Sequence, residues 1–316
     1  MLKLPSDRPD FSVVIPCRNE ESNAQAIARA VIEQMEQVGG SFDLIFIDNC
    51  STDNTVPIIR RLCEEDPRIK LIVNTRNFGQ MCSPTHAIFA AEGRAIINLC
   101  ADFQDPPELI PEFVDRWRSG AYIVLGVRET ERSGPFLKAF RKASYELQRR
   151  FGDYPIIPNA TGFGLYDARV VRSIKRLNEP QPFFRGLLVE TGFPIETIPF
   201  KRPDRAGGIS NNNFFSLLDF ALNGLAGSSK GLLRAPLYVA FVSGLLTLFG
   251  LLGALVAAFA GWSIQLWLLA AAIQGQFTLL FLFIGLVGVQ VGQISDRTRG
   301  TPLVVERERV NFDQDD

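Results

Sequence analysis

The feature that most constrains this chain is a long stretch without charge. No Asp, Glu, Lys or Arg occurs between Arg234 and Asp296. A soluble domain keeps charged side chains at its surface throughout, so a stretch of this length is typical of a membrane segment. Within it, 237–260 and 266–291 are mostly apolar, and each is long enough as a helix to cross a hydrocarbon core of about 30 Å. The sequence predicts two transmembrane helices in a hairpin (235–295) behind a soluble part; the alternative is a buried helical hairpin.

The charges around the hairpin predict its orientation. Lys230 and Arg234 precede it, Arg297 and Arg299 follow it, and the short turn between the two spans has no charge. By the positive-inside rule, both ends of the hairpin face the cytoplasm. The first ten residues lack the apolar core of a signal peptide, which agrees with a soluble part that stays in the cytosol.

Two further features concern the membrane. Apolar residues at helical spacing over 213–225 predict an amphipathic helix lying in the membrane plane, within a juxtamembrane region of 211–234, or else packed on the soluble domain. Gln274, Gln276 and Gln290 fall within the second span. Polar side chains in lipid usually face another helix, so these would bond across the hairpin or to a second copy of the chain.

Composition excludes several classes of function. Lys and Arg (33) nearly balance Asp and Glu (34), so no basic field indicates a nucleic-acid partner. The five cysteines are odd in number and form no CxxC, which favours a reducing compartment over a disulfide framework. The lone histidine, His86, excludes a His-rich metal site, and we expect it to be a helix-surface or packing residue.

Before the hairpin, short apolar runs alternate with helical stretches. This alternation predicts an α/β domain with a parallel sheet and helices on both faces. The predicted strands are 11–16, 42–47, 69–73, 95–99 and 122–125, and the predicted helices lie near 21–38, 55–65, 84–91 and 106–117. In such sheets, ligands bind beyond the carboxyl ends of the strands.

Polar segments follow four of these strands, at 16–20, 48–51, 74–79 and 100–104. They predict a nucleotide site at one edge of the sheet, although the chain has neither GxGxxG nor GxxxxGK[ST], so it is neither a dinucleotide nor a P-loop binder. Some polar residues have a structural explanation. The spacing predicts Asp105 as a helix N-cap with Glu108 closing a capping box, and Ser51 and Asp53 as caps of the preceding helix.

Asp102 and Gln104 are not explained by capping. Two oxygen-bearing side chains spaced by two on an extended stretch point the same way, and together they can bind one hard cation such as Mg²⁺ or Mn²⁺.

Seven motifs in order resemble those of family 2 glycosyltransferases, in the branch of dolichol-phosphate mannose synthase and bacterial polyprenyl-phosphate glycosyltransferases. They lie at 12–20 (SVVIPCRNE), 47–53 (IDNCSTD), 76–79 (RNFG), 101–108 (ADFQDPPE), 161–166 (TGFGLY), 184–187 (FRGL) and 205–210 (RAGGIS). The tail at 299–310 is also similar to the segment that follows the membrane helices in that family.

The resemblance implies a GT-A fold for 1–210, a nucleotide-sugar donor and a divalent metal, Mg²⁺ or Mn²⁺. It implies that Asp102, Arg128 and Arg141 are catalytic, with Asp102 and Gln104 on the metal and the two arginines on an acceptor phosphate. For Arg141 the alternative is a basic helix lying against anionic headgroups. The donor-binding residues that the resemblance implies are Pro16, Asn19, Glu20, Asp48, Asn77, Gly79, Arg205 and Ser210.

The implied activity is inverting transfer of a single sugar from a UDP- or GDP-sugar to a polyprenyl phosphate such as undecaprenyl phosphate. The acceptor oxygen is already anionic, so the reaction needs no strong general base, which suits a chain with one histidine. The implied location is a bacterial-type inner membrane, with the catalytic domain and both termini, including a 296–316 tail, in the cytoplasm.

The chain departs from the family pattern at four positions. Cys100 replaces the first Asp of a DxD, Asn49 replaces the second Asp of a DDGS, Asn159 stands for an Asp, and Asn211 stands for a Lys. These departures motivate the alternative of a catalytically weakened nucleotide-sugar-binding scaffold, or of a partner in a cell-surface glycan export or modification system.

Overall fold

The computed structural model describes residues 8–129, 157, 159–180, 182–201 and 302–312, with scattered positions between 269 and 300. The first predicted span (237–260) and the predicted amphipathic helix lie outside the described residues, and the second span is described only at isolated positions. Among the described residues, no helix has both the length and the apolar character needed to cross a membrane.

The first half of the domain alternates strands and helices, as predicted. Its elements are β1 (Phe11–Cys17), α1 (Ala24–Val38), β2 (Phe42–Asp48), α2 (Thr55–Glu65), β3 (Ile69–Asn74), α3 (Gly79–Ala90) and β4 (Ala95–Asn98). β1 pairs in parallel with both β2 and β4, and β2 pairs in parallel with β3. The predicted strands match within about a residue, whereas α3 begins five residues before the predicted helix and has Pro84 in its interior.

The second half departs from an all-parallel sheet. Its elements are η1 (Pro107–Leu109), α4 (Ile110–Arg118), β5 (Ile123–Arg128), β6 (Ala160–Asp167), α6 (Ala168–Leu177), α7 (Phe184–Glu190), β7 (Ile195–Phe200) and β8 (Glu306–Val310). The sheet order is β7-β5-β6-β4-β1-β2-β3-β8, and β6 runs antiparallel to both β4 and β5. The predicted parallel sheet was therefore wrong for this half, where the sheet is mixed.

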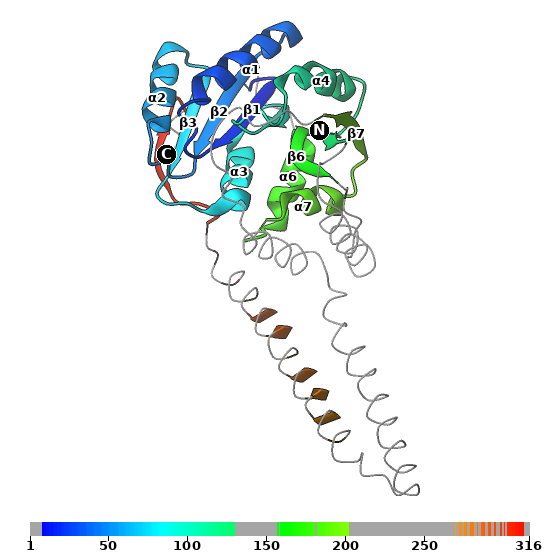
Figure 1. The fold of residues 1–316 in the computed structure, drawn as a ribbon. Helices are drawn as coiled ribbons and strands as arrows, with labels where there is room; N and C mark the ends of the chain where they lie inside the picture. The colour runs from blue at the N-terminus through cyan, green and yellow to red at the C-terminus, as the bar shows by residue number, and fades with distance from the viewer. Residues whose placement is uncertain are drawn as a thin grey trace, which may run out of the picture.

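Helices cover both faces of the sheet, as predicted (Figure 1). On one face, α1, α2 and α4 pack Val31, Ile59 and Phe113 against the inward side chains of the strands. On the other face, α3, α6 and α7 contribute residues such as Ile88 and Val170 to a second apolar layer. The central strands are buried along their whole length, which fixes the positions of the loops at their carboxyl ends.

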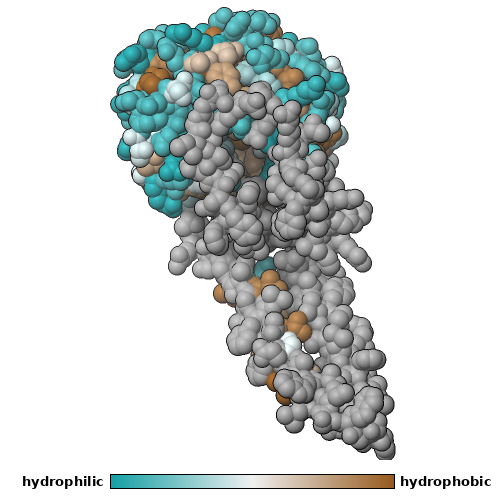
Figure 2. Space-filling view, viewed as in Figure 1, coloured by the Kyte–Doolittle hydropathy of each residue, from teal (hydrophilic) through white to brown (hydrophobic). Residues whose placement is uncertain are grey.

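The last strand, β8, comes from far along the chain (Figure 1). It pairs antiparallel with β3, with Leu71 opposite Val310 and Val73 opposite Glu308. It therefore covers what would otherwise be an open sheet edge beside β3. Figure 2 shows that the described surface on the viewed side is mostly hydrophilic, with apolar residues in small groups.

Candidate functional site

The carboxyl ends of β1, β2, β3 and β4 lie at one edge of the sheet. In the register, Cys17 is opposite Asp48 on β2, and Asp48 is opposite Val73 on β3. The polar segments that follow these strands are therefore brought to the same edge, as the sequence predicted for a ligand site.

The loops after β1 and β2 are joined by hydrogen bonds around Asp48, which is fully buried. The Asp48 carboxylate accepts the backbone N–H of Ser51 (2.9 Å) and the Ser51 hydroxyl. The Ser51 oxygen accepts the Asn19 N–H at 2.9 Å, and Asn19 Oδ1 accepts the Thr52 N–H at 2.9 Å. Asn19 adopts φ 55°, a left-handed conformation that Asn tolerates. Asp48 and Asn19 thus fix the shape of this edge.

The starts of α1 and α2 are joined in the same way. The Glu20 N–H donates to Thr55 Oγ1 (2.8 Å), and Glu20 Oε2 accepts Asn23 Nδ2 (2.7 Å). The N-cap residue of α2 is Asn54, so the predicted N-cap at Asp53 was wrong, although Asp53 Oδ1 accepts the N–H of Thr55, the first residue of α2, at 3.0 Å. Desolvation raises the pKa of Asp53, but hydrogen bonds from Thr55 and Glu21 outweigh it and lower that pKa. Ser51 does not cap α2; its hydroxyl bonds Asp48 instead.

Asn49 holds the segment between β3 and α3. Its Nδ2 donates to Asn77 Oδ1 (2.8 Å) and to the Gly79 carbonyl (3.1 Å), and its Oδ1 accepts the Phe78 N–H (2.9 Å) and Asn74 Nδ2 (3.2 Å). An Asp side chain at this position could not donate the hydrogen bonds to Asn77 Oδ1 and to the Gly79 carbonyl. The departure from the family pattern therefore has a structural role in placing Asn77 and Gly79.

We expect Asn49→Asp to lower the free energy of unfolding by about 2 kcal/mol. The substitution removes two donors and turns a carboxylate oxygen toward the acceptors Asn77 Oδ1 and the Gly79 carbonyl. Thermal unfolding measures the effect. The control is Gln25→Glu, an amide-to-carboxylate change at an exposed residue in the first turn of α1, with an expected shift below about 0.5 kcal/mol. Equal shifts for the two variants would contradict the role given to Asn49.

The loop after β4 carries Asp102 and Gln104, and both side chains are half-buried. Asp102 Oδ1 accepts the Gln104 N–H at 3.2 Å, and Phe103 between them has φ 59°. Asp105 does not cap the helix, contrary to the prediction: η1 begins at Pro107, and no side chain caps it. Pro107 has no N–H to donate to a capping oxygen. Asp105 Oδ2 instead accepts the Cys100 N–H at 3.1 Å.

The donor set of this loop fits a metal held jointly with a substrate. The described residues contain no cluster of three or more His, Cys, Asp or Glu side chains placed to bind a metal. Mg²⁺, however, usually takes one or two carboxylates together with substrate phosphates. The hard oxygens of Asp102 and Gln104 match that pattern, so the residues present fit a divalent cation bound with a diphosphate.

Cys100 is a poor ligand for such a metal. The residue is exposed overall, yet desolvation of the thiol raises its pKa well above the ordinary value, and the Asp105 and Asp102 carboxylates raise it further. The thiol is therefore protonated at neutral pH, and a thiol is in any case a soft ligand. A metal at this loop would therefore be bound by Asp102 and Gln104 and not by Cys100.

Arg128 ends β5, next to this loop. Its backbone N–H donates to the Asn159 carbonyl at 3.4 Å. Desolvation raises the pKa of Asp105 and of Cys100 overall, and the positive charge of Arg128 opposes this rise at both groups. Arg128 is therefore close enough to act on both ends of the candidate metal loop. Arg141, Arg205 and Ser210, the other predicted cationic and donor-loop residues, lie outside the described residues.

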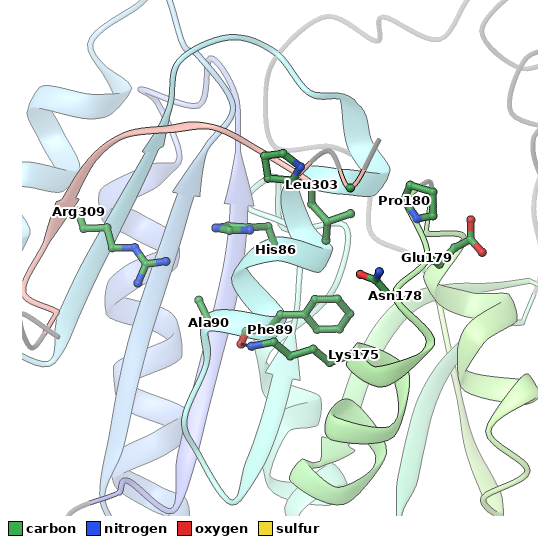
Figure 3. Close-up of a pocket in the computed structure, with 11 residues that line it drawn as sticks. His86, Phe89, Ala90, Lys175, Asn178, Glu179, Pro180, Leu303 and Arg309 are labelled. Carbon is green, nitrogen blue, oxygen red and sulfur yellow. Dashed lines mark hydrogen bonds between the residues drawn. The ribbon is translucent and has the colours of Figure 1, made fainter. Parts of the chain in front are cut away.

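A cavity of about 340 Å³ lies on another side of the domain, between α3, α6 and the segment leading into β8 (Figure 3). Figure 3 shows His86 and Phe89 from α3, Lys175 from α6 and Leu303 from the tail around it. None of the residues predicted for the donor, metal or acceptor lines this cavity.

His86 is a half-buried residue of α3, and its Nε2 forms a hydrogen bond with the carboxylate of Glu306, at the start of β8. Arg309 Nη2 donates to the same carboxylate at 2.7 Å. Although desolvation raises the pKa of Glu306, its contacts with Arg309 and His86 lower it overall. The histidine thus fastens β8 to α3, a partner that no sequence pattern indicated.

Fold and site together define a class. The arrangement is that of an α/β nucleotide-sugar-binding domain. Parallel strands end in polar loops, β6 runs antiparallel beside β4, and acid and amide side chains follow β4 directly. The chain belongs to glycosyl transferase family 2, whose model matches residues 12–174. It is therefore a glycosyltransferase.

Relatives support this assignment over most of the chain. An uncharacterized glycosyltransferase of Bacillus subtilis, YkcC, is 30% identical over 298 residues, covering 93% of this chain and 92% of that protein. The bactoprenol glucosyl transferase of Shigella phage SfV is 32% identical over 244 residues, covering 76% of this chain and 79% of that protein.

A solved structure has a similar fold. The crystal structure of glucosyl-3-phosphoglycerate synthase from Mycobacterium tuberculosis, in complex with phosphoglyceric acid, matches with a TM-score of 0.50 at 16% identity, covering 69% of this chain and 78% of that chain. The predicted GT-A-type domain is thereby confirmed as an α/β fold, with the mixed sheet described above.

Proposed function

We propose that this glycosyltransferase moves one sugar, with inversion, from a UDP- or GDP-sugar to a polyprenyl phosphate at a membrane surface. The observation that carries the proposal is the loop after β4, which bears Asp102 and Gln104 and whose two ends, Cys100 and Asp105, lie within the electrostatic range of Arg128. Metal ligands and a cation at one place suit a reaction in which both donor and acceptor carry phosphate.

The donor half of the site is proposed to act on the leaving diphosphate. Asp102 and Gln104 would hold Mg²⁺ or Mn²⁺ against it, and the bound cation would supply charge neutralisation as the sugar bond breaks. The fixed loops of Asn19, Asp48 and Asn77 would receive the nucleoside, with Arg205 and Ser210 on a donor loop. The hydrogen bonds around Asp48 and Asn49 support this part, because they hold the loops rigid before a ligand arrives.

The acceptor half is proposed to bind a lipid phosphate. A guanidinium matches phosphate oxygens with two parallel hydrogen bonds, which suits Arg128 and Arg141 to this acceptor. The phosphate oxygen is already anionic at neutral pH, so it can attack the sugar without a general base. The name of the phage relative, bactoprenol glucosyl transferase, supports a polyprenyl acceptor.

Membrane attachment is part of the proposal. The two charge-free spans would anchor the chain in a bacterial-type inner membrane, with the catalytic domain and both termini in the cytoplasm, where the lipid phosphate meets the site. Glutamines in the second span favour self-association. This is supported by the sequence pattern alone.

A second candidate is a nucleotide-sugar-binding scaffold with weakened catalysis, which one observation favours. Cys100 replaces an Asp in the metal loop, and its protonated thiol supplies no hard ligand. Under this alternative the chain binds nucleotide and serves a cell-surface glycan export or modification system.

Nucleotide release by the purified full-length protein in detergent distinguishes the two. The protein is incubated with undecaprenyl phosphate and Mn²⁺ or Mg²⁺ against a panel of UDP- and GDP-sugars. Release that requires both lipid phosphate and metal supports transfer and identifies the donor. Tight UDP or GDP binding without release over the panel supports the scaffold, and no binding at all contradicts both.

A further inference from the structure

Asp105 is a buried carboxylate to which the sequence gave only a capping role. It is 1% exposed, and its Oδ2 accepts the Cys100 N–H at 3.1 Å. Its Oδ1 has no hydrogen-bond partner among the described residues. A buried carboxylate oxygen without a partner costs stability, so its retention at this place calls for a specific use.

The hydrogen bond from Cys100 closes a loop. It joins the last residue of the segment 100–105 to the first, and the residues between them include both candidate metal ligands. Inside the closed segment, Asp102 Oδ1 accepts the Gln104 N–H, and Phe103 is held at a positive φ of 59°. The conformation that turns Asp102 and Gln104 outward therefore depends on the Asp105 side chain.

Burial decides the titration of Asp105. Desolvation raises the pKa of this carboxyl overall, although the hydrogen bonds from Cys100 and the positive charge of Arg128 lower it in part. The contact that fixes the segment is the hydrogen bond from the Cys100 N–H, which an uncharged oxygen at the same place can also accept.

We propose that Asp105 is a positioning residue for sugar transfer: its carboxylate oxygen accepts the Cys100 N–H and thereby closes the loop that presents Asp102 and Gln104. This inference rests on the proposed function, because it assigns Asp105 to the donor half of that site. Two substitutions distinguish the acceptor oxygen of Asp105 from its charge.

Asp105→Asn keeps an oxygen that can accept the Cys100 N–H but removes the charge. In the full-length protein in detergent, we expect it to change the Mn²⁺ concentration for half-maximal binding of UDP or GDP by no more than about twofold. Asp105→Ala removes the acceptor oxygen as well, and we expect it to raise that Mn²⁺ concentration by about tenfold. Calorimetry over a Mn²⁺ titration measures nucleotide binding, and steady-state kinetics measure KM for undecaprenyl phosphate.

The control is Asp43→Asn. Asp43 is similarly buried, at 4% exposed, but it lies near the start of β2 and pairs with Lys70 at 2.8 Å, away from the carboxyl ends of the strands. The Asp43→Asn variant should have a lower melting temperature, with unchanged metal dependence of nucleotide binding and unchanged acceptor KM. If the role of Asp105 is purely structural, Asp105→Asn and Asp105→Ala will both behave as this control does.

The outcomes separate this inference from the proposed function. If both Asp105 variants bind nucleotide with wild-type metal dependence, loop closure by Asp105 is overturned. If the wild type binds nucleotide with Mn²⁺ but transfers to no lipid phosphate, the proposed acceptor fails, while the nucleotide-binding comparison still decides the loop role.

Discussion

Asp102→Ala is expected to reduce sugar transfer at least a hundredfold while leaving the fold intact. Asp102 is the one carboxylate of the candidate metal pair, and removal of one preorganised group that stabilises transition-state charge typically costs about 10²–10³ in rate. Its side chain is half-buried in a loop rather than packed in the core, so we expect a small cost in stability. The measurement is kcat over a Mn²⁺ titration, with the melting temperature recorded alongside.

Cys100→Ser is the matched control in the same loop. The hydroxyl is close in size to the thiol and keeps a hydrogen on the side chain, so we expect less than a threefold change in kcat. Full activity of Asp102→Ala would show that the metal assignment is wrong. Equal losses in both variants would instead indicate that the loop tolerates no change.

Deletion of residues 302–316 is expected to cost about 4 kcal/mol or more of folding free energy. The deleted segment supplies the whole of β8, which pairs with β3, and Arg60 and Glu308 form an ion pair of 2.7 Å across the same edge. Asn311 Nδ2 donates to the carbonyls of Cys63 (2.7 Å) and Ile69 (2.8 Å), so two buried acceptors lose their partner. Thermal unfolding and limited proteolysis of the full-length and truncated proteins measure the loss.

The control deletion removes only 313–316, after Phe312, and keeps every tail contact described above. We expect its melting temperature to stay within about 2 °C of wild type. A truncated protein without 302–316 that unfolds at the wild-type temperature would contradict the role of β8 in the domain.

The local sequence pattern was sufficient to predict the first half of the domain, from β1 to β4. Apolar runs such as those of β1 and β2 are bounded by polar residues and alternate with helical stretches, so their positions and parallel pairing follow from short-range signals. β6 is different, because Gly162 and Gly164 interrupt its sequence as they would a loop. Gly164 packs against the Val124 carbonyl, where a Cβ would lie only 2.2 Å from the oxygen. The glycine is therefore required by a contact with another strand, which the local sequence does not show.

The candidate site divides in a similar way. The loop bearing Asp102 and Gln104 could be placed after β4 from sequence because its signal is local. The hydrogen bond of Asp105 with the Cys100 N–H could not be predicted, because an Asp before two prolines also fits the pattern of a helix cap. The pairing of His86 with Glu306 spans 220 residues and leaves no local pattern. Arg128 is the last residue of β5, whereas the sequence placed it shortly after a strand ending at residue 125, so its place near a strand's carboxyl end followed from a local pattern.

The position of β8 has a consequence for the order in which the protein is made. Thr75 donates both its N–H and its hydroxyl to the Val305 carbonyl, at 2.9 and 3.0 Å, across a separation of 230 residues. A ribosome delivers β3 long before it delivers β8. During that interval the edge of β3, which leads into the Asn77 loop, has no partner strand from the tail, and an unpaired edge is a template for wrong pairing. Nascent chains stalled between residues 200 and 300 should therefore hold an incomplete nucleotide pocket, and the enzyme becomes competent only late in its own synthesis.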